Sequence, residues 1–360
     1  MKSNMLHIVW VLFFWVACIG ERSEDGGRES LGSRGKIDVE ILVRGADEHD
    51  FVRTVRFVVF DDASVSPTLD INEFVVLGDE ERDATRFKTT LEVKTNPDKM
   101  LVVVVNEPQV MTSVLNAVIA PEQLEEMLFR MDDTFSFDHV QPLMSGIPMS
   151  GVKRKIVVEE NVTTNEKITI ERAVARVELW LKKADEIAFA RLSTSMNSRV
   201  LLENTYGKGY LVTGTEADKT RFQTGLEIEN NFGYIQTPTS GFEHVIWNYR
   251  DANVLELSDA PQRICMFYTP ERTYEVADDR NKLFLDIRGL SSPEGERGIR
   301  TALTEFIPEG GSSPRVITEI RRNNIYRIIG TVKEKTVQFE QAVLPWTEAG
   351  QGTISDPQYY

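Results

Sequence analysis

KITIERAVARVELWL occupies residues 167–181, and its apolar positions change parity partway along. The first apolar residues, Ile168 and Ile170, are even-numbered. The later ones are all odd-numbered: Ala173, Ala175, Val177, Leu179 and Leu181. Because strand side chains alternate between faces, a one-residue change moves every later side chain to the other face. We interpret the segment as a strand that leaves one sheet and joins another, with a bulge inside a single sheet as the alternative.

Short apolar runs with strand character lie on both sides of this segment, separated by Gly, Pro and Asp clusters. The predicted strands are Lys36–Arg44, Val55–Phe60, Phe87–Lys94, Met100–Val105, Gly151–Val158, Arg263–Tyr268, Lys282–Arg288, Thr301–Ile307, Asn324–Val332 and Thr336–Leu344. Met100–Val105 is apolar throughout, which predicts a central strand covered on both faces. We therefore expect an all-β, mainly antiparallel protein with two sandwiches in series, over residues 36–166 and 167–360.

One helix is predicted, and it begins at Pro121, a residue that suits the first helical position. Its apolar residues fall at helical spacing on one face: Leu124, Met127, Leu128 and Met131. We interpret this stripe as core packing. The IPMSG segment at residues 147–151 is expected to form a turn.

The chain begins with an apolar leader that ends at a cysteine. His7–Ala17 is long enough for a signal peptide and too short to span a bilayer, and Cys18 follows it directly. This predicts a lipoprotein signal peptide over residues 1–18, with an ordinary secretory signal and an incidental Cys18 as the alternative. Residues 19–35 are polar and Gly-rich, which predicts a flexible tether.

Charge and motif content exclude several function classes. The net charge of −15 argues against a nucleic-acid partner, because phosphate binding depends on clustered Lys and Arg. The sequence has no HExxH, GxSxG, GxxxxGK[ST] or strand-following GxGxxG motif. The acidic group Asp47–Asp50 is interpreted as a solvated loop, and Cys265 as a buried packing residue. We expect no catalytic residue, no metal and no cofactor.

The first predicted strand carries a signal of its own. Ile37, Val39, Ile41 and Val43 alternate with polar residues, as in a half-buried strand. The strand stops at Arg44-Gly45, and an acidic loop follows. A strand that ends at a basic residue beside an accessible loop raises the hypothesis that proteolysis removes it.

Three segments resemble, in this order, the signature segments of the Bacteroidales type V pilins, the FimA/Mfa-like fimbrillins. They are Ile170–Leu179 (IERAVARVEL), Arg322–Tyr326 (RNNIY) and Val343–Trp346 (VLPW). The early strand pair and the IPMSG turn also fit this family, so the resemblance runs from the leader to about Trp346. It implies two tandem transthyretin-like β-sandwich domains with little helix. It also implies a subunit of an extracellular fimbrium (pilus) that supports cell adhesion.

The resemblance further implies how such a subunit assembles. Cys18 would be lipidated, as with palmitate, and would anchor the chain to the outer membrane. An Arg-specific protease would then cut at Arg44-Gly45 and remove the strand that carries Ile37, Val39, Ile41 and Val43. A strand of another fimbrial subunit would fill the groove head-to-tail, which is donor-strand exchange and builds a filament.

The candidate donor strand is residues 336–346. Val337, Phe339 and Val343 share one parity and would replace the lost apolar row, although Gln341 interrupts it. Trp346 lies on the opposite face. The alternative is a plain last strand of the second domain.

Three other interpretations stay open. A cut at Arg34-Gly35, expected in the tether, would leave the first strand in place. A fimbrial anchor or accessory subunit would keep that strand. A monomeric surface lipoprotein that binds a glycan or a protein would need exposed aromatics, for which the candidates are Tyr206, Tyr210, Trp247 and Tyr249.

Overall fold

The computed structural model describes residues 33–43, 52–62, 66–78, 86–135, 146–193, 199–212, 228–229, 234–236, 254–273, 282–308 and 313–346. Several predictions from the sequence lie outside these ranges: those on the signal peptide with Cys18, the Arg44-Gly45 bond, Asp47–Asp50, Trp247, Tyr249 and the tail after Trp346. Everything described belongs to one compact unit that starts at Ser33. No helix in these ranges is long and apolar enough to cross a membrane.

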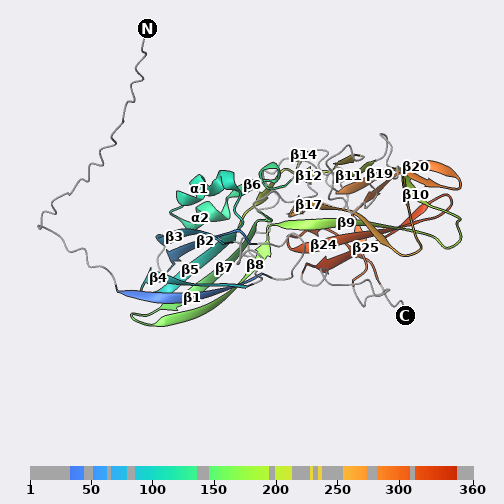
Figure 1. The fold of residues 1–360 in the computed structure, drawn as a ribbon. Coiled ribbons are helices and arrows are strands. Elements are labelled where there is room, and N and C mark those ends of the chain that lie inside the picture. The colour runs from blue at the N-terminus through green and yellow to red at the C-terminus, as the bar shows by residue number, and fades with distance from the viewer. Residues whose placement is uncertain are drawn as a thin grey trace, which may run out of the picture. The chain divides into compact units, whose positions relative to one another are not determined.

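Seven strands form the first sheet, in the order β3-β2-β5-β7-β8-β1-β4 (Figure 1). Their bounds are Arg34–Val43 for β1, Thr54–Asp61 for β2, Thr68–Val76 for β3, Arg86–Lys94 for β4, Asn96–Val105 for β5, Met149–Val158 for β7 and Thr163–Arg172 for β8. β7 and β8 pair at two positions only. The sheet therefore divides there into two layers, β3-β2-β5-β7 and β8-β1-β4, which share the first hydrophobic core.

The central strand is where the sequence predicts it. β5 lies between β2 and β7, and Met100–Val105 is buried at every position. A strand that is apolar on both faces avoids water only when both faces are covered. The prediction is confirmed.

The predicted helix is too long. α2 spans Pro121–Glu125 and begins at Pro121 as expected, but Leu128–Arg130 forms strand β6 and Met131–Asp133 a 3-10 turn. β6 pairs with β13 (Lys208–Tyr210), so its backbone groups find partners on another strand and not in a helix. Leu124, Met127 and Met131 are nevertheless buried, so the core-packing interpretation of these three holds.

Other short elements complete this part of the chain. They are the 3-10 turn η1 (Gln109–Met111) and helix α1 (Thr112–Asn116), which precede α2. The IPMSG segment is only partly a turn, because Met149–Gly151 already belongs to β7.

The chain changes sheets at one residue. β8 ends at Arg172 in the first sheet, and β9 (Val174–Lys183) begins in a second sheet of order β17-β9-β24-β25. Ala173 lies between them, and this single extra residue produces the parity change seen in the sequence. The prediction of a strand that leaves one sheet and joins another is confirmed, and the bulge alternative is wrong.

The strands of the second part form a second hydrophobic core. In β17-β9-β24-β25 the further bounds are Gln262–Pro270 for β17, Asn324–Val332 for β24 and Val337–Pro345 for β25. The facing sheet has the order β15-β11-β19-β10-β16, and β20 also pairs with β19. Its bounds are Arg191–Ser193 for β10, Arg199–Glu203 for β11, Tyr234–Gln236 for β15, Val254–Glu256 for β16, Phe284–Ser292 for β19 and Gly295–Ala302 for β20.

Three further pairs of short strands form separate two-stranded sheets among the described residues. They are β12 (Thr205–Tyr206) with β14 (Ile228–Glu229), β18 (Arg272–Thr273) with β23 (Glu319–Ile320), and β21 (Glu305–Phe306) with β22 (Arg315–Val316). The predicted strand Thr301–Ile307 is wrong as one element, because it is divided between β20 and β21. The all-β, mainly antiparallel fold class is confirmed. The division into domains at residue 167 stays a prediction, although Val174 belongs to the first core and Ala175 to the second.

Deletion of Ala173 should abolish folding. Without this residue, β9 would enter the second sheet with its apolar side chains on the wrong face. We expect insoluble protein or the loss of a cooperative thermal transition in circular dichroism. Ala173→Gly keeps the residue count and should cost only about 1 kcal/mol. A deletion variant that melts like the parent would contradict this account of the crossover.

Candidate functional site: the first strand and the anchored last strand

β1 lies inside its layer and not at an edge. It pairs with β4 in antiparallel fashion from Arg34 to Leu42 and with β8 in parallel fashion from Lys36 to Val43. β4 has no other ladder partner in the described sheet. Removal of β1 would therefore open a slot with unpaired backbone groups on both sides and leave β4 without a partner.

The apolar face of β1 is fully packed. Ile37, Val39, Ile41 and Val43 all lie in the first core, and none is more than 8% exposed. The sequence therefore identified the buried face of this strand. Burial of a Val or Ile side chain contributes roughly 1.5–3 kcal/mol, so these four contribute on the order of 6–12 kcal/mol.

The polar face of β1 contributes less. The Glu40 carboxylate forms an ion pair with Arg86 Nε at 2.7 Å, and the Asp38 carboxylate accepts a hydrogen bond from the Thr90 hydroxyl at 2.6 Å. The Arg86 side chain is 61% exposed and the Thr90–Asp38 bond lies at the surface, so each interaction is worth about 0–1 kcal/mol. The apolar row and the two ladders hold this strand.

The bond between Arg34 and Gly35 lies in β1, so the expectation that it sits in the tether is wrong. Arg34 pairs with Lys94, and Gly35 pairs with Val93. A Cβ atom at Gly35 would stand 2.4 Å from the backbone oxygen of Glu159, so the backbones approach too closely for any side chain. Proteases require an extended segment free of such pairing, and this bond does not offer one.

β25 contains three of the four candidate donor residues, Val337, Phe339 and Val343, and forms the edge of its sheet. It pairs with β24 at nine positions, from Val337 to Pro345. Val337, Phe339 and Val343 pack together against the second core, as their shared parity predicts. The interrupting Gln341 is also explained, because its side-chain amide donates to the Ala302 carbonyl at 2.7 Å.

Trp346, one residue beyond β25, is anchored in the first core and is only 2% exposed. Its backbone N–H donates to the Asn323 carbonyl at 3.1 Å, and its own carbonyl accepts from Arg172 Nη1 at 3.2 Å. The ring stacks on Tyr268 and lies under the guanidinium groups of Arg172 and Arg176, at 4.4 and 4.8 Å. The body of β25 thus packs on one core and its end on the other.

The sequence motifs meet at this tryptophan. Arg172 Nη1 donates to Asn323 Oδ1 at 2.8 Å, and the Asn323 N–H donates to the Val174 carbonyl at 2.9 Å. The Ala173 N–H donates to the Pro148 carbonyl of IPMSG at 2.8 Å. The sequence identified these segments but not the contacts between them, and it predicted no role for Arg172 or Tyr268. The two arginines of IERAVAR, Arg172 and Arg176, are the sequence feature that could have indicated these contacts.

Solved structures share this arrangement of sandwiches. The tip fimbrial protein Mfa3 of Porphyromonas gingivalis, solved with a C-terminal truncation, matches with a TM-score of 0.57 and 14% identity over 87% of this chain and 100% of its own. A fimbrilin, FimA, of the same species matches with a TM-score of 0.51 and 12% identity over 87% and 98%. A candidate cell adhesion protein of Bacteroides eggerthii matches with a TM-score of 0.54 and 11% identity over 89% and 98%.

The chain has the fimbrillin fold. No family model and no curated protein matches the sequence. At such low identity the likeness is one of fold, and it agrees with the resemblance expected from the motifs.

A buried ionic cluster lies beside Trp346 in the fimbrillin fold. The Glu178 carboxylate contacts Arg176 at 2.8 Å and Arg327 at 2.9 Å, and it accepts from the Trp180 indole N–H. Burial by itself raises the pKa of Glu178, but the charges of Arg176 and Arg327 outweigh it and bring the pKa below the ordinary value. Burial lowers the pKa of Arg176, and the Glu178 charge opposes that shift. The cluster therefore holds its carboxylate ionised.

The aromatic candidates for ligand binding do not form an exposed cluster among the described residues. Tyr206 is buried, and the Arg272 guanidinium covers its ring at 4.4 Å. Tyr210 is half-buried in β13. Trp247 and Tyr249 lie outside the described ranges. The described part of the fimbrillin fold thus offers no aromatic platform for a sugar.

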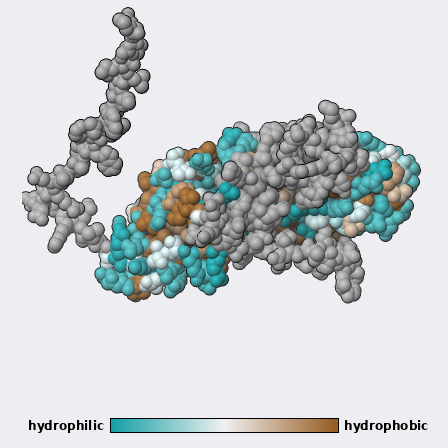
Figure 2. Space-filling model, in the orientation of Figure 1, coloured by the Kyte–Doolittle hydropathy of each residue, from teal (hydrophilic) through white to brown (hydrophobic). Residues whose placement is uncertain are grey.

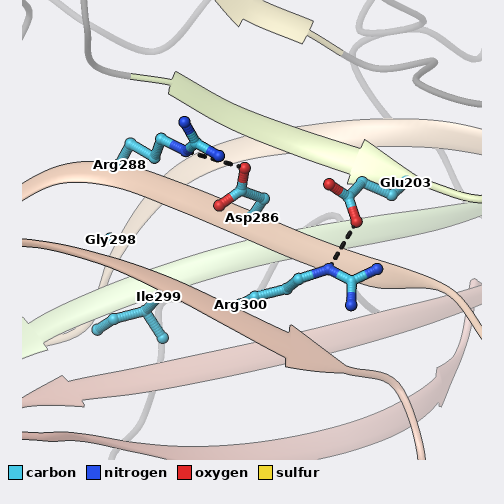
Figure 3. Close-up of a pocket in the computed structure, with 6 residues that line it drawn as sticks. All are labelled: Glu203, Asp286, Arg288, Gly298, Ile299 and Arg300. Carbon is cyan, nitrogen blue, oxygen red and sulfur yellow. Dashed lines mark hydrogen bonds and ion pairs between the residues drawn. The ribbon is translucent and has the colours of Figure 1, made fainter. Parts of the chain in front are cut away.

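A shallow surface hollow lies over β11, β19 and β20 (Figure 3). Its two arginines are already paired: Arg288 Nε with Asp286 at 3.2 Å and Arg300 Nε with Glu203 at 2.7 Å. Arg300 also covers the Phe284 ring at 3.5 Å. Because these charges satisfy one another, the hollow is a weak candidate for ligand recognition.

Two remaining features have ordinary explanations. Cys265 is buried, and burial raises the pKa of its thiol, so it fits the packing role predicted for it. Figure 2 shows apolar side chains on the visible surface around α1, where Val110, Val114 and Ile119 are exposed. Apolar atoms contribute much of the surface of any folded protein, so these three side chains need no special explanation.

Trp346→Ala should destabilise the protein by about 3–5 kcal/mol, because a buried indole ring leaves a cavity. Urea unfolding measures the loss, and hydrogen exchange should show faster exchange at the β25 end than in the parent. Trp346→Phe keeps a ring between the arginines and Tyr268 and should lose less. A loss below about 1 kcal/mol in Trp346→Ala would contradict the anchoring role.

Acid should remove the contribution of the Glu178 carboxylate to the free energy of unfolding. The unfolded glutamate binds its proton at higher pH than the folded one, so protonation favours unfolding. The contribution is complete above the ordinary pKa of 4.5 and is lost as the pH falls through the lower folded pKa. Urea unfolding across this range should show Glu178→Gln losing less stability in acid than the parent. If the free energies of unfolding of the two proteins fell in parallel with decreasing pH, the lowered pKa of Glu178 would be contradicted.

Proposed function

We propose that this chain is a non-enzymatic structural subunit of a cell-surface fimbria that joins its neighbours by donor-strand exchange. Its export would use the 1–18 leader, Cys18 would carry the lipid anchor in the outer membrane, and an Arg-specific protease would cut at Arg44-Gly45. The solved proteins of this fold include a tip fimbrial protein and a fimbrilin, which supports a fimbrial role.

The observation that carries the proposal is the position of β1. The strand has ladders on both sides and an apolar row without a polar interruption. Loss of that row removes on the order of 6–12 kcal/mol of burial, which is comparable to the whole stability of a typical domain. The first sandwich would therefore need a replacement strand, and a neighbouring subunit would supply it.

β25 would be the donated strand in a stalk subunit. As an edge strand it would break one ladder on leaving, the one to β24, together with the hydrogen bonds that Gln341 makes to Ala302 and Ile307. Its withdrawal would also expose Trp346, and removal of that ring costs about 3–5 kcal/mol. The donor residues Val337, Phe339, Val343 and Trp346 would then have to recover this energy in the next subunit.

The alternative role is that of an anchor or accessory subunit that keeps β1. One observation favours it: the end of β25 is fixed by the Trp346 ring between Arg172 and Arg176. Such a subunit would not offer β25 to a neighbour. A monomeric glycan-binding lipoprotein has no comparable support in the described residues.

Digestion with an Arg-specific protease tests the proposal. We expect a new N-terminus at Gly45 and filaments in electron micrographs, because cleavage frees the slot of β1. Arg44→Ala should block both results, whereas the matched control Arg34→Ala should leave both unchanged. A protein that stays monomeric after complete cleavage at Gly45 would rule out polymerisation and leave the accessory role.

A synthetic peptide with the sequence of Lys36–Val43 should inhibit filament growth after cleavage. It would restore both ladders and the apolar row and so occupy the slot in place of a neighbour. A peptide with Val39→Asp and Ile41→Asp should not inhibit, because each carboxylate would enter the core unpaired. Equal inhibition by both peptides would contradict strand addition as the mode of assembly.

A further inference from the structure

Lys99 is the most unusual residue of the first sandwich. Its side chain is 0% exposed, although lysine is almost never fully buried unless it is paired. It lies in β5, directly before the apolar run Met100–Val105. A buried amine of this kind is a nucleophile held away from water, so its neighbours decide what it can do.

Two carboxylates contact the Lys99 amine. Asp61 Oδ1 lies 2.5 Å from Nζ, and Asp61 is the cross-strand partner of Lys99 on β2. Asp70 Oδ2 lies 2.6 Å from Nζ, and Asp70 is the extra residue where the register of β2 and β3 shifts. Such a bulge redirects a side chain, and here it brings a second carboxylate to the amine.

The charges of this group do not balance. The other buried pair of the sandwich, Arg56 with Glu107, matches one cation to one anion through two hydrogen bonds. Lys99 instead faces two anions, and Asp70 is only 2% exposed. Buried charge is costly, and an uncompensated one more so. An amide between Lys99 and Asp70 would remove the two most deeply buried charges of the group. The net charge would stay the same, but it would then lie on Asp61, which is 23% exposed.

We propose that Lys99 Nζ and Asp70 Cγ form an intramolecular isopeptide bond, with Asp61 as the proton carrier. Asp61 takes a proton from the Lys99 ammonium, and the neutral amine attacks Asp70 Cγ. The new C–N bond forms, and one Asp70 oxygen leaves as water after Asp61 delivers protons to it. Three ammonium protons are thus divided between one amide N–H and one water, and no further reactant is needed.

The surroundings assign the two aspartates to different roles. Asp70 Oδ2 also accepts the backbone N–H of Lys94 at 2.8 Å, so a donor is in place where negative charge develops during attack. Asp61 is 23% exposed and so provides a route by which the water departs. The deeply buried Asp70 is the acyl group, and the more exposed Asp61 is the acid and base.

The bond would close a ring from residue 70 to residue 99 that contains β4. Among the described strands β4 pairs with β1 alone, so it is the strand most affected when β1 is removed. A covalent link would fix both flanks of β4 to the sheet and keep the slot in shape. This structural role rests on the proposed function. The bond itself can be tested in the uncut chain, independently of polymerisation.

Mass spectrometry of the full-length chain, without protease treatment, tests the bond. Condensation should lower the intact mass by about 18 Da, the mass of one water. A tryptic digest should contain a branched species of Phe57–Arg82 joined to Thr95–Arg130, since a modified Lys99 resists trypsin. Fragmentation should place the link on Asp70. An unmodified mass with cleavage after Lys99, or a link on Asp61, would overturn the proposal.

Variants separate the chemistry from folding. Asp61→Asn keeps the size of the side chain but removes the proton carrier, so the folded variant should show the full mass. Lys153→Gln removes an exposed lysine, 45% accessible, and should retain the mass deficit. Circular dichroism confirms folding of both. A deficit that persists in Asp61→Asn would overturn the role of Asp61. None of these results depends on cleavage or filament formation, so failure here leaves the fimbrial proposal intact.

Discussion

The link between the two cores depends on the contacts around Ala173, where the chain passes from one sheet to the next. Val174 still belongs to the first core and Ala175 already belongs to the second, and Arg172, Asn323 and Trp346 close the junction with hydrogen bonds and ring contacts. Because only Ala173 lies between β8 and β9, the backbone has little conformational freedom at this crossover. The cation–ring contacts therefore hold the end of the last strand to the place where the first sheet ends.

Periodicity predicted most of the fold because the buried faces are regular. Ile37, Val39 and Ile41 needed only the alternation of a strand, and the parity change at Ala173 needed only counting. The helix at Pro121 was predicted too long for a physical reason. Leu128 fits a helical stripe, but pairing of β6 with β13 over a long sequence separation overrides local preference.

Contacts between distant segments explain what the sequence left hidden. Nothing local in Arg172 indicates a partner at Trp346, and nothing in Arg34 indicates that its bond lies in a ladder with Lys94. The grouping of Lys99 with Asp61 and Asp70 depends on a bulge between β2 and β3, which alternation alone does not reveal. Alternation in the sequence predicts the strands, whereas the topology determines which strands and side chains are neighbours.

The two ladders of β1 run in opposite senses, one parallel with β8 and one antiparallel with β4. A strand that entered the slot backwards would face the wrong hydrogen-bonding pattern on both sides at once. Any segment that restores both ladders must therefore run as β1 does. The site selects the polarity of its occupant as well as its apolar row, and a fibre built through it would have all its subunits pointing the same way.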